Sequence, residues 1–172
     1  MPLIETTRLH LRPLTIDDFA SVRQLWAHAD VVSFISGTPS TPEESWARLL
    51  RYIGHWTVFG FGYFAILDKA DGRYLGECGL MEFLREIKPS LAGSAEAGWV
   101  LRPDAWGRGL ATEAMNAVLG WYGARSDAQP LSCIIAPDNA ASIKVAARLG
   151  FVLDAETLYR ERPTLVFRWG IL

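Results

Sequence analysis

The segment from Leu101 to Ala114 most constrains how this chain can fold. It passes from an apolar strand through a turn with Gly107 and Gly109 directly into a helix, expected over residues 109–122. Glycine tolerates left-handed backbone angles and lets the main chain approach a ligand, while the free N–H groups and the dipole of a helix start favour an anion. The segment therefore predicts a phosphate-binding helix start, although two glycines alone more often mark only a tight turn.

Strands and helices alternate through the C-terminal half around this segment. We expect strands over residues 95–101 and 131–135, a helix over residues 139–149, and two more short strands near Phe151 and over Thr164–Gly170. Such alternation implies a parallel strand pair joined by a right-handed crossover helix. The fold class is mixed α/β.

The N-terminal half reads as one strand, two helices and a hairpin. Residues 8–12 alternate polar and apolar, and an amphipathic helix is expected after Thr15, with Phe19, Val22, Leu25, Trp26 and Ala29 on one face. A second helix is expected from the cap Thr41 to about Phe59. The hairpin strands are Tyr63–Leu67 and Tyr74–Phe83, and a long loop follows over Leu84–Ser94.

The length and net charge of the chain restrict its domain organisation and the classes of partner that it can bind. A chain of 172 residues is expected to form a single domain over residues 1–172. With 17 Lys and Arg against 19 Asp and Glu, the net charge of −2 argues against nucleic acid or an anionic membrane as a partner. Two cysteines and an N-terminus without a long apolar run favour a reduced protein in the cytoplasm.

Three motifs together resemble a known family. They are Thr7–Leu14 at the start, the glycine segment with Trp106, Gly109 and Ala111, and Asn139 with Ser142 ahead of the sequence Leu-Gly-Phe that ends at Phe151. The chain resembles the GNAT superfamily of N-acetyltransferases, and specifically its RimJ/RimL-type branch of ribosomal-protein N-acetyltransferases. One position departs from the family loop pattern, because Trp106 stands where the family has glutamine or arginine.

The resemblance implies the GNAT fold, in which a mixed central sheet has a splayed parallel strand pair and flanking helices, and it implies acetyl-CoA as co-substrate. The coenzyme's pantetheine arm then lies along the strand that precedes the loop, its pyrophosphate contacts the loop and helix start, and the strand 131–135 splays away. The residues expected to bind the coenzyme are Trp99, Val100, Leu101, Trp106, Gly107, Arg108, Gly109, Leu110, Ala111, Thr112, Asn139 and Ser142. For Asn139 the alternative is a helix cap.

Glu96 is the candidate general base, by its resemblance to the family's glutamate on the same strand. An exposed glutamate has a pKa of about 4.3, so burial beside Trp99 and apolar strands has to raise the pKa for this role. The alternative is a solvent-facing residue that balances a nearby arginine, and Glu77 and Glu82 are rival bases. A base matters most for lysine acceptors, because at pH 7.5 about a third of α-amines but only about a thousandth of lysine side chains are neutral.

Ser142 is the candidate general acid for the departing thiolate. Many family members use a tyrosine in the last helix, and Ala146 occupies that place here. The alternative for Ser142 is ordinary hydrogen bonding at a helix start. Cys133, within an apolar run, is expected to pack rather than to act as a nucleophile, and the three histidines lack metal-ligand spacing.

The leading hypothesis is direct transfer of an acetyl group from acetyl-CoA to a primary amine in a ternary complex. The acceptor is a protein or peptide N-terminal α-amine, a polyamine-like molecule or an amino sugar. Two alternatives remain, a non-catalytic acyl-CoA-binding sensor or scaffold and a nucleotide-binding Rossmann unit. The protein is expected to be a monomer, or a homodimer joined through its terminal strands.

Overall fold

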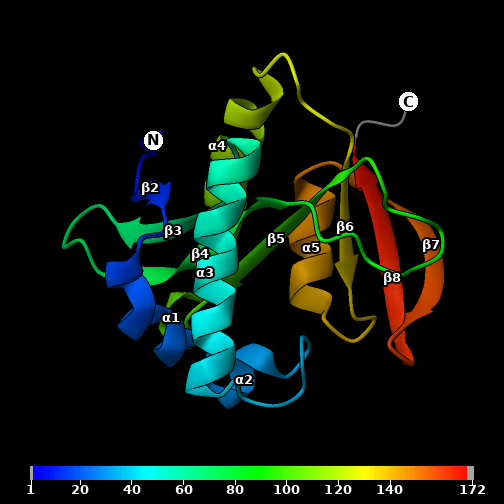
Figure 1. The fold of residues 1–172 in the computed structure, drawn as a ribbon, viewed down its shortest axis with the longest axis horizontal. Coiled ribbons are helices and arrows are strands. Elements are labelled where there is room, and N and C mark those ends of the chain that lie inside the picture. Colours follow the sequence, from blue (N-terminus) through cyan, green and yellow to red (C-terminus); the bar gives the residue numbers. More distant parts are fainter. Residues whose placement is uncertain (1, 170–172) are drawn as a thin grey trace.

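A single mixed sheet of eight strands organises the computed structural model, which describes residues 2–169 (Figure 1). The strand order is β1-β2-β3-β4-β5-β6-β8-β7. All neighbouring strands are antiparallel except β5 and β6, which are parallel. The strands are β1 (Ile4–Glu5), β2 (Leu9–Pro13), β3 (Tyr63–Asp68), β4 (Tyr74–Met81), β5 (Ala95–Leu101), β6 (Leu131–Ile135), β7 (Phe151–Tyr159) and β8 (Arg162–Trp169).

Helices cover both faces of this sheet. They are α1 (Phe19–Trp26), α2 (Ala29–Val32), α3 (Pro42–Phe59), α4 (Leu110–Gly123) and α5 (Ala140–Arg148), with short 3-10 turns over Ile16–Asp18 and Pro103–Ala105. Helices α1 to α3 pack with Tyr63, Ala65 and Met81 on one face, whereas α4 and α5 pack with Phe64 and Ile66 on the other. The last turns of α3 also contact α4, because the Trp56 and Trp121 rings lie 5.7 Å apart.

Local capping signals place the helix starts. Thr41 accepts a hydrogen bond from the Glu44 N–H at 3.2 Å, and the Glu44 carboxylate accepts one from the Thr41 N–H at 2.7 Å, so α3 begins at Pro42 as predicted. Thr15 and Asp18 form the same reciprocal pair before α1.

Three expectations from the sequence are wrong. Ala29 does not extend the first helix, because the backbone at His28 is extended and Ala29 opens the separate helix α2. The terminal strands are not short, since β7 and β8 have nine and eight residues and form one long hairpin, and Gly170 lies outside the described residues. The strand expected to reach Phe83 ends at Met81, and β1 was not predicted.

Strands β5 and β6 diverge after a short contact. Their register contains only Ala95 with Leu131 and Glu96 with Ser132, after which β6 continues along β8 (Figure 1). Helix α4 connects these two strands, as predicted for the crossover. The expected splay is confirmed, and it leaves one edge of β5 without a partner strand beyond Glu96.

Candidate active site

The turn between β5 and α4 presents free main-chain amides to solvent. Gly107 and Gly109 have φ angles of +70° and +74°, the left-handed region that glycine adopts without strain. Gly109 stands at the N-cap position of α4 and offers no side-chain acceptor, so the first-turn N–H groups of Leu110, Ala111 and Thr112 have no partner within the helix. Trp106, Gly107 and Arg108 are exposed. This geometry suits an anion at the helix start.

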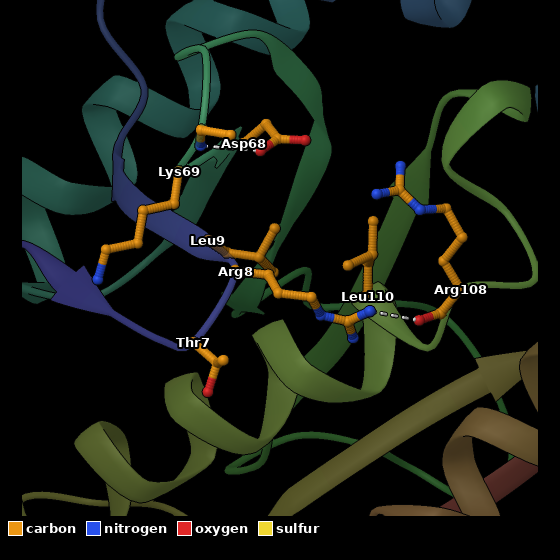
Figure 2. Close-up of a pocket in the computed structure, with 8 residues that line it drawn as sticks. Thr7, Arg8, Leu9, Asp68, Lys69, Arg108 and Leu110 are labelled. Carbon is orange, nitrogen blue, oxygen red and sulfur yellow. Dashed lines mark hydrogen bonds between the residues drawn. The ribbon is translucent and has the colours of Figure 1, made fainter.

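Arg8 and Glu113 hold this turn, a role that the sequence analysis did not assign. Arg8 donates to the Arg108 carbonyl at 2.9 Å (Figure 2) and, through Nε, to the Glu113 carboxylate at 2.6 Å. Thr6 also donates to Glu113 at 2.6 Å. Arg8 belongs to the motif Thr7–Leu14, which resembles the family, and this motif is the only sequence signal that pointed to Arg8.

Trp106 packs back onto the strand end. Its indole N–H donates to the Leu101 carbonyl at 2.8 Å, while its side chain stays about half exposed. The Trp106 indole therefore already binds the carbonyl of Leu101, a residue that was expected to contact the pantetheine arm.

Every second residue of β5 directs its main-chain N–H and C=O groups to the open edge of the strand. The Ala95 N–H donates to the Pro130 carbonyl at 2.9 Å, so by strand alternation the main-chain groups of Ala97, Trp99 and Leu101 point to the same edge. Beyond Glu96 no β6 residue is in register with them. Val100 pairs with Glu77 of β4, which turns its main-chain groups the other way.

Asn139 and Ser142 stand across the splay from this edge. The Asn139 side-chain oxygen accepts from the Ser142 N–H at 3.1 Å, the bond of a helix cap, and both residues are half-buried. The indole N–H of Trp99 donates to the Ser142 hydroxyl oxygen at 3.3 Å. Ala146, one turn later, is fully buried. The structure thus joins Trp99, Asn139 and Ser142 in one cluster.

Glu96 is buried and paired. The residue is 6% exposed, on the face of β5 opposite to Trp99, and Arg85 of the long loop binds both of its carboxylate oxygens, at 2.5 and 2.7 Å. Burial raises the pKa of Glu96, and Arg85 opposes that rise. Arg85 also donates to the Tyr159 hydroxyl at 3.1 Å. The alternative for Glu96, a solvent-facing residue that balances an arginine, is therefore correct for the arginine contact and wrong for the exposure of Glu96.

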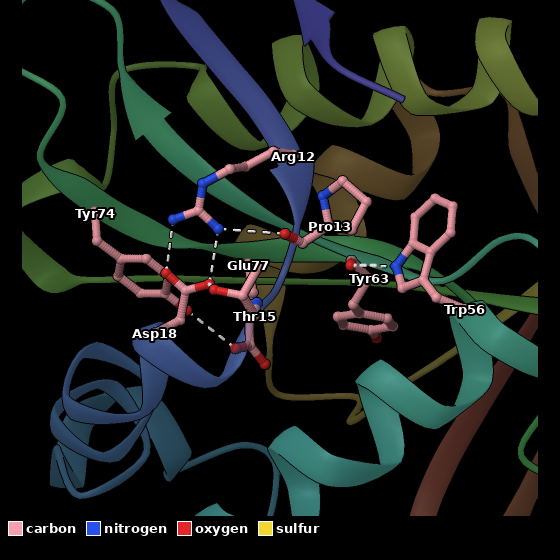
Figure 3. Close-up of polar contacts among 8 residues, drawn as sticks. All are labelled: Arg12, Pro13, Thr15, Asp18, Trp56, Tyr63, Tyr74 and Glu77. Atoms are coloured by element: carbon pink, nitrogen blue, oxygen red, sulfur yellow. Dashed lines mark hydrogen bonds and ion pairs between the residues drawn. The ribbon is translucent and has the colours of Figure 1, made fainter. Parts of the chain in front are cut away.

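Of the two rival glutamates, Glu82 is half-buried on the loop that follows β4, and Glu77 lies in the core. Glu77 is completely buried and accepts hydrogen bonds from Trp26 and Tyr52 at 2.9 and 2.8 Å. It also accepts one from the Tyr74 hydroxyl at 3.0 Å (Figure 3). Burial raises the pKa of Glu77, and these bonds oppose the rise. Because its oxygens bind side chains from α1, α3 and β4, Glu77 joins the helices to the sheet.

The cysteines and histidines do not form a nucleophilic or metal site among the described residues. Cys133 is 1% exposed, and burial raises the pKa of its thiol, which keeps it protonated. Within residues 2–169 no group of three or more His, Cys, Asp or Glu side chains is arranged to hold a metal ion. In the same residues, no helix has the length and apolar character needed to cross a membrane.

Comparison with known proteins agrees with this geometry. The family model described as "Acetyltransferase (GNAT) domain" matches residues 8–152. The chain belongs to the GNAT acetyltransferase family. A curated relative, "Uncharacterized N-acetyltransferase p20" of Bacillus licheniformis, is 26% identical over 152 residues, which cover 88% of this chain and 83% of the relative.

Solved structures of this family superpose along the whole chain. A putative GNAT-family acetyltransferase from Bordetella pertussis has a TM-score of 0.88 at 27% identity and covers 99% of this GNAT chain and 100% of its own. The ribosomal L7/L12 α-N-protein acetyltransferase RimL, solved with coenzyme A, has a TM-score of 0.78 at 18% identity and 97% coverage of both chains. At that identity the RimL likeness shows the shared fold alone.

Proposed function

We propose that this GNAT protein transfers an acetyl group from acetyl-CoA to a primary amine. The observation that supports this most is the open edge of β5 beside the uncapped amides of α4. The strand edge offers hydrogen bonds to an extended amide chain, and the helix start binds an anion. Coenzyme A carries both groups in that order, the pantetheine amides followed by the pyrophosphate. The chemistry of the donor set therefore fits the coenzyme.

The residues assigned to the coenzyme divide by the group that each would hold. The amides from Gly107 to Thr112 would bind the pyrophosphate, and the edge of Ala97 and Trp99 would bind the pantetheine amides. The Thr112 hydroxyl is buried without a hydrogen-bond partner among the described residues, which fits a polar ligand at this helix start. Within residues 2–169 the amide nitrogen of Asn139 makes no hydrogen bond, so it can donate to a ligand.

Glu96 is the proposed base for the amine. Arg85 takes one lone pair on each carboxylate oxygen, and a carboxylate has about four such sites, so the others can accept the amine's proton directly or through a water molecule. The raised pKa of Glu96 strengthens it as a base. As the C–N bond forms and the C–S bond breaks, the nitrogen releases one proton towards Glu96.

Ser142 is the proposed donor to the leaving sulfur. The Trp99 N–H occupies a lone pair of the Ser142 oxygen, so the serine hydrogen is free to point elsewhere. A thiolate with a thiol pKa of about 8.5 gains from a proton near neutral pH. The Trp99 bond also stabilises negative charge that develops on the serine oxygen as it donates.

A second candidate function is acyl-CoA binding without catalysis. Two observations favour it, the paired state of Glu96 and the fully buried Ala146 at the place of the family's tyrosine. Under this hypothesis the coenzyme site is intact and no acetyl group leaves it.

Two measurements separate these functions. Acetyl-CoA should raise the melting temperature of the protein and NADH should not, and the absence of a shift with acetyl-CoA would overturn both candidates. Release of free thiol from acetyl-CoA is then measured with spermine, glucosamine and peptides that begin with serine or alanine. Amine-dependent release supports the transferase, whereas binding without release on every acceptor supports the sensor.

A further inference from the structure

The Tyr63 side chain crosses β4 to reach β5. Tyr63 opens β3 and is in register with Gly79 of β4, which is in register with Gly98 of β5. A Cβ atom on Gly98 would overlap the Tyr63 hydroxyl, and one on Gly79 would overlap the Tyr63 main chain. Gly98 therefore leaves the space for the Tyr63 hydroxyl, whereas Gly79 lets the main chain at Gly62 and Tyr63 come close to β4.

Neighbouring aromatic residues hold the ring rigidly. The Tyr52 ring stacks on it at 4.6 Å with an interplanar angle of 6°. The Trp56 indole donates to the Tyr63 carbonyl at 2.8 Å (Figure 3). Tyr63 is only 6% exposed. The position of its hydroxyl is therefore set by packing on both sides of the strand end.

The Tyr63 hydroxyl has no hydrogen-bond partner among residues 2–169. The other four tyrosine hydroxyls are all bonded: Tyr52 and Tyr74 to Glu77, Tyr122 to the Gln129 N–H, and Tyr159 to Arg85. Unlike the Thr112 hydroxyl, the Tyr63 oxygen is not sealed from solvent, so a water molecule or a ligand can supply the missing bond. Burial, together with Glu96 and Glu77, raises the pKa of Tyr63, so it stays a neutral hydroxyl.

The free hydroxyl lies where the proposed reaction takes place. Gly98 and Glu96 are two residues apart on the same face of β5, about 7 Å along the strand. The open edge of β5 begins directly after Glu96, and the main-chain groups of Ala97 and Trp99 on that edge flank Gly98. An amine that reaches the thioester from the Glu96 side therefore passes the Tyr63 hydroxyl.

We infer that Tyr63 binds the acceptor nitrogen and selects primary amines, an inference that rests on the proposed transferase function. An attacking primary amine loses one proton towards Glu96 and keeps another N–H. The Tyr63 oxygen accepts that remaining N–H and aims the nitrogen lone pair at the carbonyl carbon. A secondary amine has only one N–H, which the base removes, so it has nothing left to donate to Tyr63.

The test compares Tyr63→Phe with the parent protein on the best acceptor of the panel and on its N-methyl derivative. Phenylalanine keeps the ring on Tyr52 and over the two glycines. We expect kcat/KM for the primary amine to fall about 10- to 100-fold, the size of one hydrogen bond used in the transition state. The N-methyl amine should lose less than threefold, roughly, because its reaction does not use the hydroxyl.

Tyr52→Phe is the matched control, because it deletes a hydroxyl from the same stacked pair but one that binds Glu77. It should lower the melting temperature while the preference for the primary over the N-methyl amine stays at the parent value. Equal losses on both amines in Tyr63→Phe, or no loss, would overturn the inference while the parent protein's own turnover still supports the transferase. A parent protein without turnover on any amine overturns both.

Discussion

Arg85, on the loop after β4, binds Glu96 of β5 through both carboxylate oxygens, at 2.5 and 2.7 Å. Two opposing effects act on the pKa of Glu96: burial raises it and the guanidinium lowers it, and burial prevails. Arg85 therefore limits how far burial raises the pKa of Glu96.

Replacing Arg85 with glutamine should move the acid limb of the kcat/KM profile to higher pH. Without the opposite charge, the pKa of Glu96 rises further, so the active carboxylate is lost sooner as pH falls. Arg85→Lys keeps the charge and should shift the limb less. Glu96→Gln should lower turnover and remove the limb while acetyl-CoA still raises the melting temperature. An unmoved limb in Arg85→Gln would show that Glu96 is not the base.

Ser142→Ala should lower kcat about 100-fold near neutral pH, the contribution of a general acid, with the Kd of acetyl-CoA unchanged. The defect should shrink above about pH 8.5, where the departing thiolate no longer needs a proton. Helix α5 should stay intact, because Asn139 caps the main-chain N–H of residue 142. Ser142→Thr should restore part of the rate. A defect that is the same at all pH values would contradict proton donation.

Trp99→Phe tests the bond that orients Ser142. It removes the indole N–H that donates to the serine oxygen at 3.3 Å. We expect kcat to fall several-fold, with the same pH dependence as in Ser142→Ala, and we expect no further loss when the two changes are combined. Additive losses in the double variant would mean that Trp99 acts independently of Ser142.

The two roles of Asn139 separate in two variants. Asn139→Asp keeps an oxygen that caps α5 but removes the amide nitrogen and adds a negative charge, so acetyl-CoA should bind more weakly while stability is retained. Asn139→Ala should also lose about 1 kcal/mol of the free energy of unfolding, the usual value of a cap. Isothermal titration and denaturant unfolding measure the two effects. If Asn139→Asp binds acetyl-CoA as tightly as the parent protein, the role of Asn139 is limited to capping α5.

His55 should make stability fall at mildly acidic pH. The Glu82 N–H can only donate, so Nε2 of His55 accepts it at 3.0 Å and Nδ1 carries the hydrogen that faces the Phe61 carbonyl at 2.7 Å. Burial lowers the pKa of His55 below its ordinary value of about 6.5, despite the Phe61 carbonyl and Glu82. The unfolded chain therefore binds a proton first, and stability present above about pH 6.5 is lost as pH falls below it.

The free energy of unfolding, measured from pH 7.5 to 5.5, checks this expectation. His55→Gln should show a shallower loss than the parent protein over this interval. His28→Gln is the matched control, because His28 is about half exposed and its ring lies 3.9 Å from the exposed Asp30 carboxylate. A pH dependence that His55→Gln leaves unchanged would contradict the prediction.

The sequence predicted the elements whose signals are local. The Thr41 and Glu44 pair is three residues apart and caps α3 in the structure as expected. Period-two and helical patterns located β5, β6, α4 and α5 to within about one residue. The same reasoning failed at His28, where the apolar spacing of a helix continued through a residue with extended backbone. It also missed the length of β7, because much of that strand is exposed and lacks a buried face.

The sequence by itself determined the left-handed glycines before α4, the parallel crossover and the family to which the chain belongs, because these depend on neighbouring residues and on the order of elements. Only the tertiary structure decided what surrounds the reacting groups. Arg85 reaches Glu96 from a loop without any period, Trp99 meets Ser142 across 43 positions, and Tyr63 lies on Gly98 through the register of three strands. Strand register and loop path arise from packing of the whole sheet, so no local pattern encodes these contacts.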